Sequence, residues 1–328
     1  MSSSYDIIII GAGPAGLAAG IEAQKARLSH LILDKGGIVN GIQHFQRDMF
    51  FFSTPELLEI GNIPFVIPTT RPTSRDCVNY YRNVADHFGL ELRLFEGVAS
   101  VEREGEYFVV NPSRGKSYRC RFLVAATGYY DTPTPLGVAG EDLPHVSHFY
   151  RDPLPFYRRK VVVVGGKNSA VEAALDLWRH GAEVTLVHRG TALSTGVKYW
   201  ILPDFENRVS AGSIRVEYNS TVREFLPEKT IVQKRNEVLE LENDFVFVLI
   251  GYRPDGAFLR SLGITTDPDS LAPTFDPKTM ETNIPHLFVA GGLVGGKFNN
   301  KVFIENGRTH GKLIVDAILG REPNRRPA

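Results

Sequence analysis

The chain has 328 residues, of which 43% are hydrophobic and 23% charged, and Lys plus Arg match Asp plus Glu at 37 each. This length favours two domains, and a formal net charge of zero argues against nucleic acid as a partner, because nucleic acid attracts basic surfaces. No run of 18 apolar residues predicts a membrane span, and the N-terminus lacks the basic start of a signal peptide. We therefore expect a cytoplasmic protein that binds neither membrane nor nucleic acid.

The first predicted elements form a βαβ unit. Residues 5–10 are a continuous apolar run typical of a buried parallel strand, and Pro14 suits the first position of a helix. A second strand is expected over residues 30–35. Between the first strand and the helix, GAGPAG matches the G-x-G-x-x-G turn, whose glycines allow a tight bend and a close approach of backbone to a pyrophosphate.

An acid follows this first glycine turn at the end of the second strand. The Asp34 carboxylate can accept hydrogen bonds from ribose hydroxyls and would repel a 2′-phosphate. The pattern therefore predicts FAD or NAD at the first turn, and not NADP.

Further along the chain, residues 98–110 are expected to form a hairpin and RFLVAATGYY a strand that ends in a glycine turn. The β-strand and helix plan then repeats: a strand over residues 160–164, a helix with an apolar stripe ended by Gly181, and a strand over residues 183–189. The stripe consists of Val171, Ala174, Leu175 and Trp178. A second dinucleotide-binding unit is therefore predicted.

This second turn, GGKNSA, departs from the pattern because Lys167 occupies the middle glycine position. A Cβ there obstructs a pyrophosphate unless the chain passes farther away, in which case the ammonium adds attraction. Asn168 or Ser169 is expected to cap the helix. The contact made by Lys167 is left open.

No acid ends the following strand, where His188 precedes Arg189. The guanidinium can pair with a 2′-phosphate through a charge-assisted bond of about 1.5–3 kcal/mol, roughly a 10- to 150-fold preference for NADPH over NADH. The alternative is an exposed Arg189 with no phosphate contact.

Strands over residues 244–255 and 286–292 and a helix over residues 303–319 complete the chain. We predict an α/β fold of two Rossmann-like dinucleotide-binding domains, with the second (131–253) inserted into a discontinuous first domain (1–130 and 254–328).

Several motifs together resemble a known family. GAGPAGL, AATGYY, GGKNSAVEAALDL, KYWILPDFENRV and FIENGRTHGKLI are similar to the YpdA-type bacillithiol disulfide reductases, within the thioredoxin reductase-like flavoproteins. The resemblance spans nearly the whole chain. It implies FAD in the outer domain, NADPH in the inserted domain, and hydride transfer from NADPH to FAD.

The resemblance also implies the electron acceptor: a low-molecular-weight compound, with bacillithiol disulfide the candidate, or a small redox protein. We expect a homo-oligomer. A flavin-dependent monooxygenase and a redox-sensing module that holds FAD and NADPH are the alternatives. The family's cysteine in the first glycine motif is replaced by Ala15, no CxxC is present, and Gly292 stands where thioredoxin reductases have an acid.

The other thiols offer no substitute for that cysteine. Cys77 is expected in a helix and Cys120 in a strand, where buried, unreactive thiols are common. The closest histidine pair, His145 and His148, lacks a completed ligand set, so no metal is expected.

The expected cofactor contacts come from both turns and from strand ends, and no catalytic residue is assigned. For FAD they are Gly11, Gly13, Pro14, Ala15, Gly16, Asp34, Lys35, Ser53, Val98, Thr127, Gly128, Gly291 and Gly292. For NADPH they are Gly165, Gly166, Lys167, Asn168, Ser169, Ala170, His188, Arg189 and Gly251.

Overall fold

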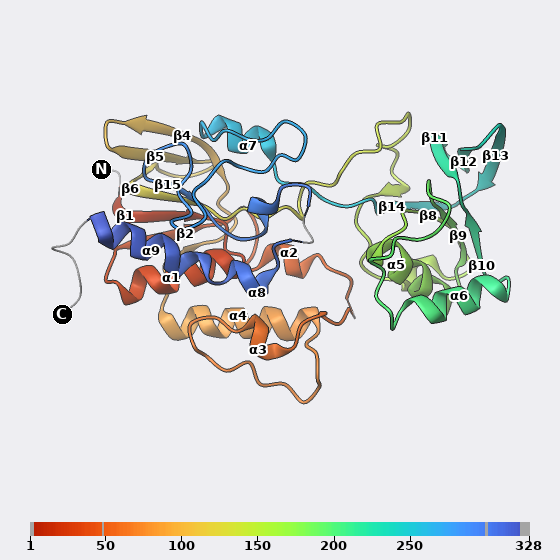
Figure 1. Ribbon diagram of the computed structural model, residues 1–328, viewed down its shortest axis with the longest axis horizontal. Coiled ribbons are helices and arrows are strands. Elements are labelled where there is room, and N and C mark those ends of the chain that lie inside the picture. The colour runs from red at the N-terminus through yellow and green to blue at the C-terminus, as the bar shows by residue number, and fades with distance from the viewer. Residues whose placement is uncertain (1–2, 48, 299–300, 322–328) are drawn as a thin grey trace. The chain divides into compact units, whose positions relative to one another are not determined.

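The computed structural model describes residues 3–47, 49–298 and 301–321 (Figure 1). The chain divides into two compact units: Met1–Thr132 with Tyr252–Ala328, and Pro133–Gly251. We call them the first and the second unit. None of the helices in the described ranges has the length and apolar character needed to cross a bilayer.

The first unit contains a sheet in the order β3-β2-β1-β6-β5-β4, with β15 pairing to β6. β1, β2, β3, β6 and β15 run parallel, whereas β4 and β5 form an antiparallel hairpin beside β6. The strands are β1 (Ser3–Ile10), β2 (His30–Leu33), β3 (Leu92–Arg93), β4 (Val98–Glu104), β5 (Tyr107–Pro112), β6 (Tyr118–Ala125) and β15 (Leu287–Val289). The predicted 98–110 hairpin is therefore confirmed, and the second strand ends before Asp34.

Helices cover this sheet, and α1 and α9 lie side by side beneath it in Figure 1. They are α1 (Pro14–Lys25), α2 (Asn40–Gln43), α3 (Pro55–Leu58), α4 (Ser74–Phe88), α7 (Gly256–Ser261), α8 (Ile304–Gly307) and α9 (His310–Arg321), with a 3₁₀ turn, η2 (Gly291–Gly295). The helix predicted over 303–319 is wrong as one element, because it is interrupted after Gly307. That glycine packs directly against Gly291, and glycine weakens a helix interior.

The second unit has a parallel sheet in the order β10-β9-β8-β14-β7, with α5 and α6 packed on it. Its elements are β7 (Val146–Ser147), η1 (Leu154–Phe156), β8 (Lys160–Val164), α5 (Asn168–Arg179), β9 (Glu183–Val187), α6 (Leu202–Ser210), β10 (Ile214–Glu217) and β14 (Phe245–Val248). The two Rossmann-like sheets confirm the predicted fold class. Trp178, expected in the apolar stripe of α5, is only partly buried.

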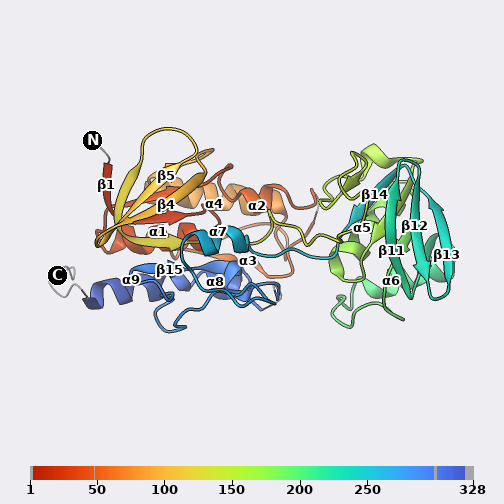
Figure 2. The ribbon, with the colours of Figure 1, turned by 90° about the horizontal axis from the view of Figure 1, so that it is seen from above.

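A separate antiparallel sheet of the second unit was not predicted. It consists of β11 (Ser220–Leu226), β12 (Lys229–Lys234) and β13 (Glu237–Glu242), which stand next to one another in Figure 2. Val222, Phe225, Val232 and Leu241 from this sheet share a core with Val162, Val164, Val246 and Val248 of the parallel sheet. The apolar side chains of β8 and β14 are thereby covered on both faces, which explains their continuous apolar runs.

Candidate functional site

Two glycines of the first turn are required by the protein itself. Gly11 has a φ of +115°, and a Cβ built there would lie 2.4 Å from the carbonyl oxygen of Ala126. A Cβ at Gly16 would lie 1.9 Å from the carbonyl oxygen of Gly11. These residues therefore let β1 turn sharply and let α1 lie against it.

The middle glycine of the turn has no such reason within the chain. Gly13 precedes α1 with φ −74° and ψ 174°, which any residue adopts. Apart from its two chain neighbours, no described residue has a heavy atom within 4 Å of a Cβ built at Gly13. Open space beside a helix N-terminus is the cradle that a pyrophosphate needs, so the turn fits a dinucleotide.

Asp34 is tied to this turn through both carboxylate oxygens. Oδ2 accepts the backbone N–H of Ala12 at 2.7 Å, and Oδ1 accepts that of Gly36 at 2.8 Å. Burial raises the pKa of Asp34, while the two N–H groups favour the ionised form. Each oxygen retains a lone pair, so the carboxylate can still accept a ribose hydroxyl.

The remaining residues expected at FAD follow the ends of neighbouring parallel strands. Thr127 and Gly128 come after β6, and the Thr127 nitrogen would lie 3.2 Å from a Cβ at Gly11. Gly291 comes after β15, where an added Cβ would lie 2.8 Å from the Cβ of Ala15. The structure thus brings the first glycine turn together with the turns after β6 and β15.

Other expected residues have protein partners. The Ser53 hydroxyl donates to the Glu305 carboxylate, and Lys35 Nζ lies 3.1 Å from Asp131 Oδ2. Val98 is the first residue of β4 and is partly buried. A Cβ at Gly292 would lie 2.5 Å from the ring of Tyr129, which places this glycine under an aromatic side chain.

One contact of this region has no signal in the sequence. The Gly291 N–H donates to Nδ1 of His310 at 3.1 Å, so the imidazole is neutral with its proton on Nε2. Burial lowers the pKa of His310, which favours this neutral form. His310 opens α9, and only the long-range fold brings it to the end of β15.

Both cysteines are fully buried, in α4 and β6 as predicted. Burial raises the pKa of Cys77 far above its ordinary value and that of Cys120 to about 12. A thiol is nucleophilic only as the thiolate, so neither side chain is suited to thiol–disulfide exchange.

The second glycine turn, like the first, contains glycines that leave no room for a side chain. Gly165 has a φ of +155°, and an added Cβ would lie 2.6 Å from both the Ala170 Cβ and the Leu249 carbonyl oxygen. A Cβ at Gly166 would lie 2.2 Å from the imidazole of His188. Packing against the helix, the next strand and His188 therefore fixes both glycines.

Capping of α5 differs from the prediction. The helix begins at Asn168 with Lys167 as its N-cap residue, and no side chain caps it. Asn168 instead donates from Nδ2 to the Gly196 carbonyl at 3.1 Å and accepts the Lys198 N–H at Oδ1 at 2.9 Å. Ser169 is exposed in the first turn of the helix. Asn168 is the first residue of the helix, one position after the N-cap. Its amide therefore binds the later segment and does not cap the free backbone N–H groups of the first turn.

Positive charge collects near this second turn. Lys167 and Arg189 are exposed, and no carboxylate within the described ranges forms an ion pair with either. Burial lowers the pKa of His188, which keeps its ring neutral against Gly166. Gly251, with φ +106°, follows β14 and accepts the Thr134 N–H at 2.9 Å. Two cations at an uncapped helix start favour a phosphorylated ligand.

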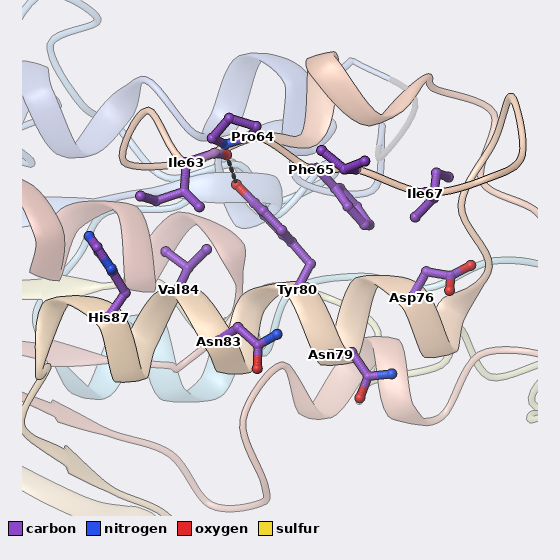
Figure 3. Close-up of a pocket in the computed structure, with 11 residues that line it drawn as sticks. Ile63, Pro64, Phe65, Ile67, Asp76, Asn79, Tyr80, Asn83, Val84 and His87 are labelled. Carbon is purple, nitrogen blue, oxygen red and sulfur yellow. Dashed lines mark hydrogen bonds between the residues drawn. The ribbon is translucent and has the colours of Figure 1, made fainter.

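An open pocket of about 420 Å³ in the first unit lies away from the predicted contacts. It is enclosed by the 63–67 segment and one face of α4, with Tyr80 at its centre and its hydroxyl donating to the Ile63 carbonyl at 2.7 Å (Figure 3). Asn79, Asn83 and His87 line the α4 side. None of the residues expected at FAD lines this pocket.

Comparison with known proteins identifies relatives along nearly the whole chain. A family model described as pyridine nucleotide-disulphide oxidoreductase matches residues 8–291. Bacilliredoxin reductase Bdr of Bacillus subtilis is 40% identical over 96% of this chain and 98% of its own length. The bacillithiol disulfide reductases Bdr (YpdA) of Staphylococcus aureus and Bacillus cereus superpose with TM-scores of 0.94 and 0.95 at 38% and 39% identity. Those alignments cover 98% and 97% of this chain and 99% and 100% of theirs.

Proposed function

This chain belongs to the pyridine nucleotide-disulphide oxidoreductase family, and we propose that it uses NADPH to reduce a low-molecular-weight disulfide, with bacillithiol disulfide as the candidate substrate. It is an oxidoreductase whose cofactors are FAD and NADPH. In the proposed reaction one NADPH and one proton convert one disulfide into two thiols.

We assign FAD to the first unit. The observation that carries this assignment is Gly13, whose lack of a side chain is unexplained by any contact within the described chain. Asp34, fixed by two backbone N–H groups, would receive the ribose hydroxyls and repel a 2′-phosphate. Bound FAD supplies a carrier that accepts two electrons from NADPH and passes them to the acceptor.

We assign NADPH to the second unit. Arg189, exposed after β9, would pair with the 2′-phosphate, and the uncapped start of α5 would receive the pyrophosphate beside Lys167. The Cβ of Lys167 would keep this backbone farther from a phosphate than a glycine does, and the ammonium would compensate by charge attraction.

We further propose that no thiol of this protein takes part. Ala15 occupies the position of the family's cysteine, and Cys77 and Cys120 are buried as thiols. Reduction of the disulfide would therefore proceed without a mixed disulfide to the chain.

The experiment is anaerobic. The FAD-loaded enzyme is bleached with one equivalent of NADPH, and bacillithiol disulfide, glutathione disulfide or a quinone is added in separate runs. The proposal expects the flavin colour to return with bacillithiol disulfide and two thiols to appear for each NADPH. Return of colour with the quinone alone contradicts the disulfide substrate. NADPH-dependent oxygenation of a sulfide or amine in air would instead favour the monooxygenase.

A further inference from the structure

A segment of the second unit, residues 194–198, is fastened to the start of α5. The two hydrogen bonds of the Asn168 amide to Gly196 and Lys198 join positions 28 and 30 residues apart. The Ser194 N–H adds a third bond, to the Gly166 carbonyl at 3.0 Å. The 194–198 segment therefore lies directly over the second glycine turn.

This attachment uses properties that only a carboxamide combines. The Asn168 side chain donates at one end and accepts at the other, and both partners are backbone groups of the same segment. Aspartate has no donor for the carbonyl, and serine is too short to span both groups. The Asn168 side chain forms no N-cap hydrogen bond with α5, so its amide binds the 194–198 segment instead.

Lys198 is the charged residue whose position this attachment fixes. Its backbone N–H is held by Asn168, and its ammonium lies 5.7 Å from the ring centroid of Trp200. Burial raises the pKa of Glu172, four residues beyond Asn168 on α5, and the Lys198 ammonium offsets part of this rise. The attachment therefore places Lys198 beside the start of α5.

The surroundings of Lys198 suit an anion. The first turn of α5 contains no acidic residue, and its N–H groups point out of the helix start. Lys167 and Arg189 are exposed near the same turn. Lys198 adds a third cation, brought from a distant part of the sequence.

We propose that Asn168 is a positioning residue for NADPH: it holds the 194–198 segment so that Lys198 binds a phosphate group of the cofactor. The inference rests on the part of the proposed function that assigns NADPH to this turn. It does not depend on the identity of the electron acceptor.

The test uses Asn168→Ala, Lys198→Ala and the double variant, with Asn207→Ala on α6 and Lys229→Ala on β12 as controls of the same residue types at exposed positions. Ferricyanide serves as the acceptor, so no disulfide enters the assay. We expect each single variant to raise KM for NADPH about tenfold and to change kcat less than about twofold, and we expect neither control to do so.

The double variant separates a positioning effect from two independent ones. If Asn168 acts through Lys198, its loss adds nothing once Lys198 is absent, and the double variant matches Lys198→Ala. Effects that multiply, or an unchanged KM in Asn168→Ala, overturn the proposal. If Asn168→Ala does not fold, Lys198→Met removes the charge but keeps most of the side-chain length, and an unchanged KM in that variant overturns the proposal.

Comparison with NADH identifies the phosphate. A loss in Lys198→Ala that is confined to NADPH assigns the 2′-phosphate, and an equal loss with both coenzymes assigns the pyrophosphate. Both support the proposal. Bacillithiol disulfide is absent from these assays. A negative result here therefore says nothing about disulfide reduction, and a failure to reduce bacillithiol disulfide would not affect the assignment of Asn168 and Lys198.

Discussion

The two glycine turns share one backbone plan and carry opposite charges. Each follows a buried parallel strand, β1 or β8, and opens a helix of 12 residues. The first has Gly13 at its middle position, and the Asp34 carboxylate accepts a hydrogen bond from the N–H of Ala12 in the same turn. The second has Lys167 at that position and Arg189 after the next strand. On this shared plan, a few side chains can decide which nucleotide each turn takes.

The features that the turns share are those the chain itself requires. Gly11 and Gly165 both have a positive φ, and an added Cβ would lie 2.4 and 2.6 Å from a carbonyl oxygen of the adjoining segment. The middle positions differ because packing places no demand on them. This contrast separates Gly11 and Gly165, which the fold requires, from Gly13, for which we propose a role in ligand binding.

The largest expected effect tests the folding role. We expect Gly11→Ala to lower the free energy of unfolding by about 2–4 kcal/mol, because the added Cβ meets the Ala126 carbonyl at a positive φ. Urea unfolding of the FAD-free protein measures this, and Gly13→Ala is the matched control, expected to change it by less than about 1 kcal/mol. Equal losses in the two variants would contradict the separation.

The next effect tests the charge at the second turn. We expect Arg189→Ala to lower the ratio of kcat/KM for NADPH to that for NADH by about 10- to 150-fold, the equivalent of one lost charge-assisted bond. Steady-state rates with both coenzymes measure it, with FAD content as the control. An unchanged ratio would mean that Arg189 is an exposed residue without a phosphate contact.

Glu172 gives a pH-dependent effect near the second turn. Burial raises its pKa to about 7, so the folded chain keeps a proton that the unfolded chain releases from about pH 4.5 upward. The wild-type protein should therefore lose stability as the pH rises from about 4.5 to 7. We expect Glu172→Gln to be more stable at pH 8 by about 1–2 kcal/mol, less than the full shift implies because the side chain is partly exposed.

Thermal unfolding of wild type and Glu172→Gln across pH 4–8 measures this difference. The two proteins should converge toward pH 4, where the wild-type carboxyl is protonated in both states. A constant difference across the range would show that the carboxylate carries no burial penalty.

The smallest expected effect concerns the thiols. Iodoacetamide should leave the disulfide-dependent rate of the folded enzyme within about twofold of the untreated rate, because Cys77 and Cys120 are buried and protonated. Mass spectrometry of the intact protein checks that neither thiol reacts. A rate lost together with one alkylated cysteine would restore a thiol relay.

Local patterns predicted the strands and helices around both turns and the fold class. Glycine, proline and apolar runs determine the backbone over a few residues, so β1, α1, β8 and α5 follow from short stretches of sequence. The β11–β13 sheet was missed although its strands have six or seven residues, because the turns that join them, at residues 227–228 and 235–236, contain no glycine. The break between α8 and α9 depends on Gly307 meeting Gly291, which only the folded chain reveals.

Site contacts across long sequence distances could not be predicted either. The Asn168 amide was expected at a helix cap and instead binds a segment about 30 residues later. His310 reaches Gly291 only because α9 packs beside α1. The cofactor contacts assigned to each turn, the homo-oligomer and the cytoplasmic location remain predictions.

The central claim is that the first turn holds FAD and the second holds NADPH, and calorimetric titration of Gly13→Ala with FAD and with NADP⁺ tests it most directly. The account predicts an FAD affinity at least about tenfold below that of the wild type, because the new Cβ fills the phosphate cradle, with NADP⁺ affinity unchanged. Unchanged FAD affinity, or an equal loss for both nucleotides, would contradict it.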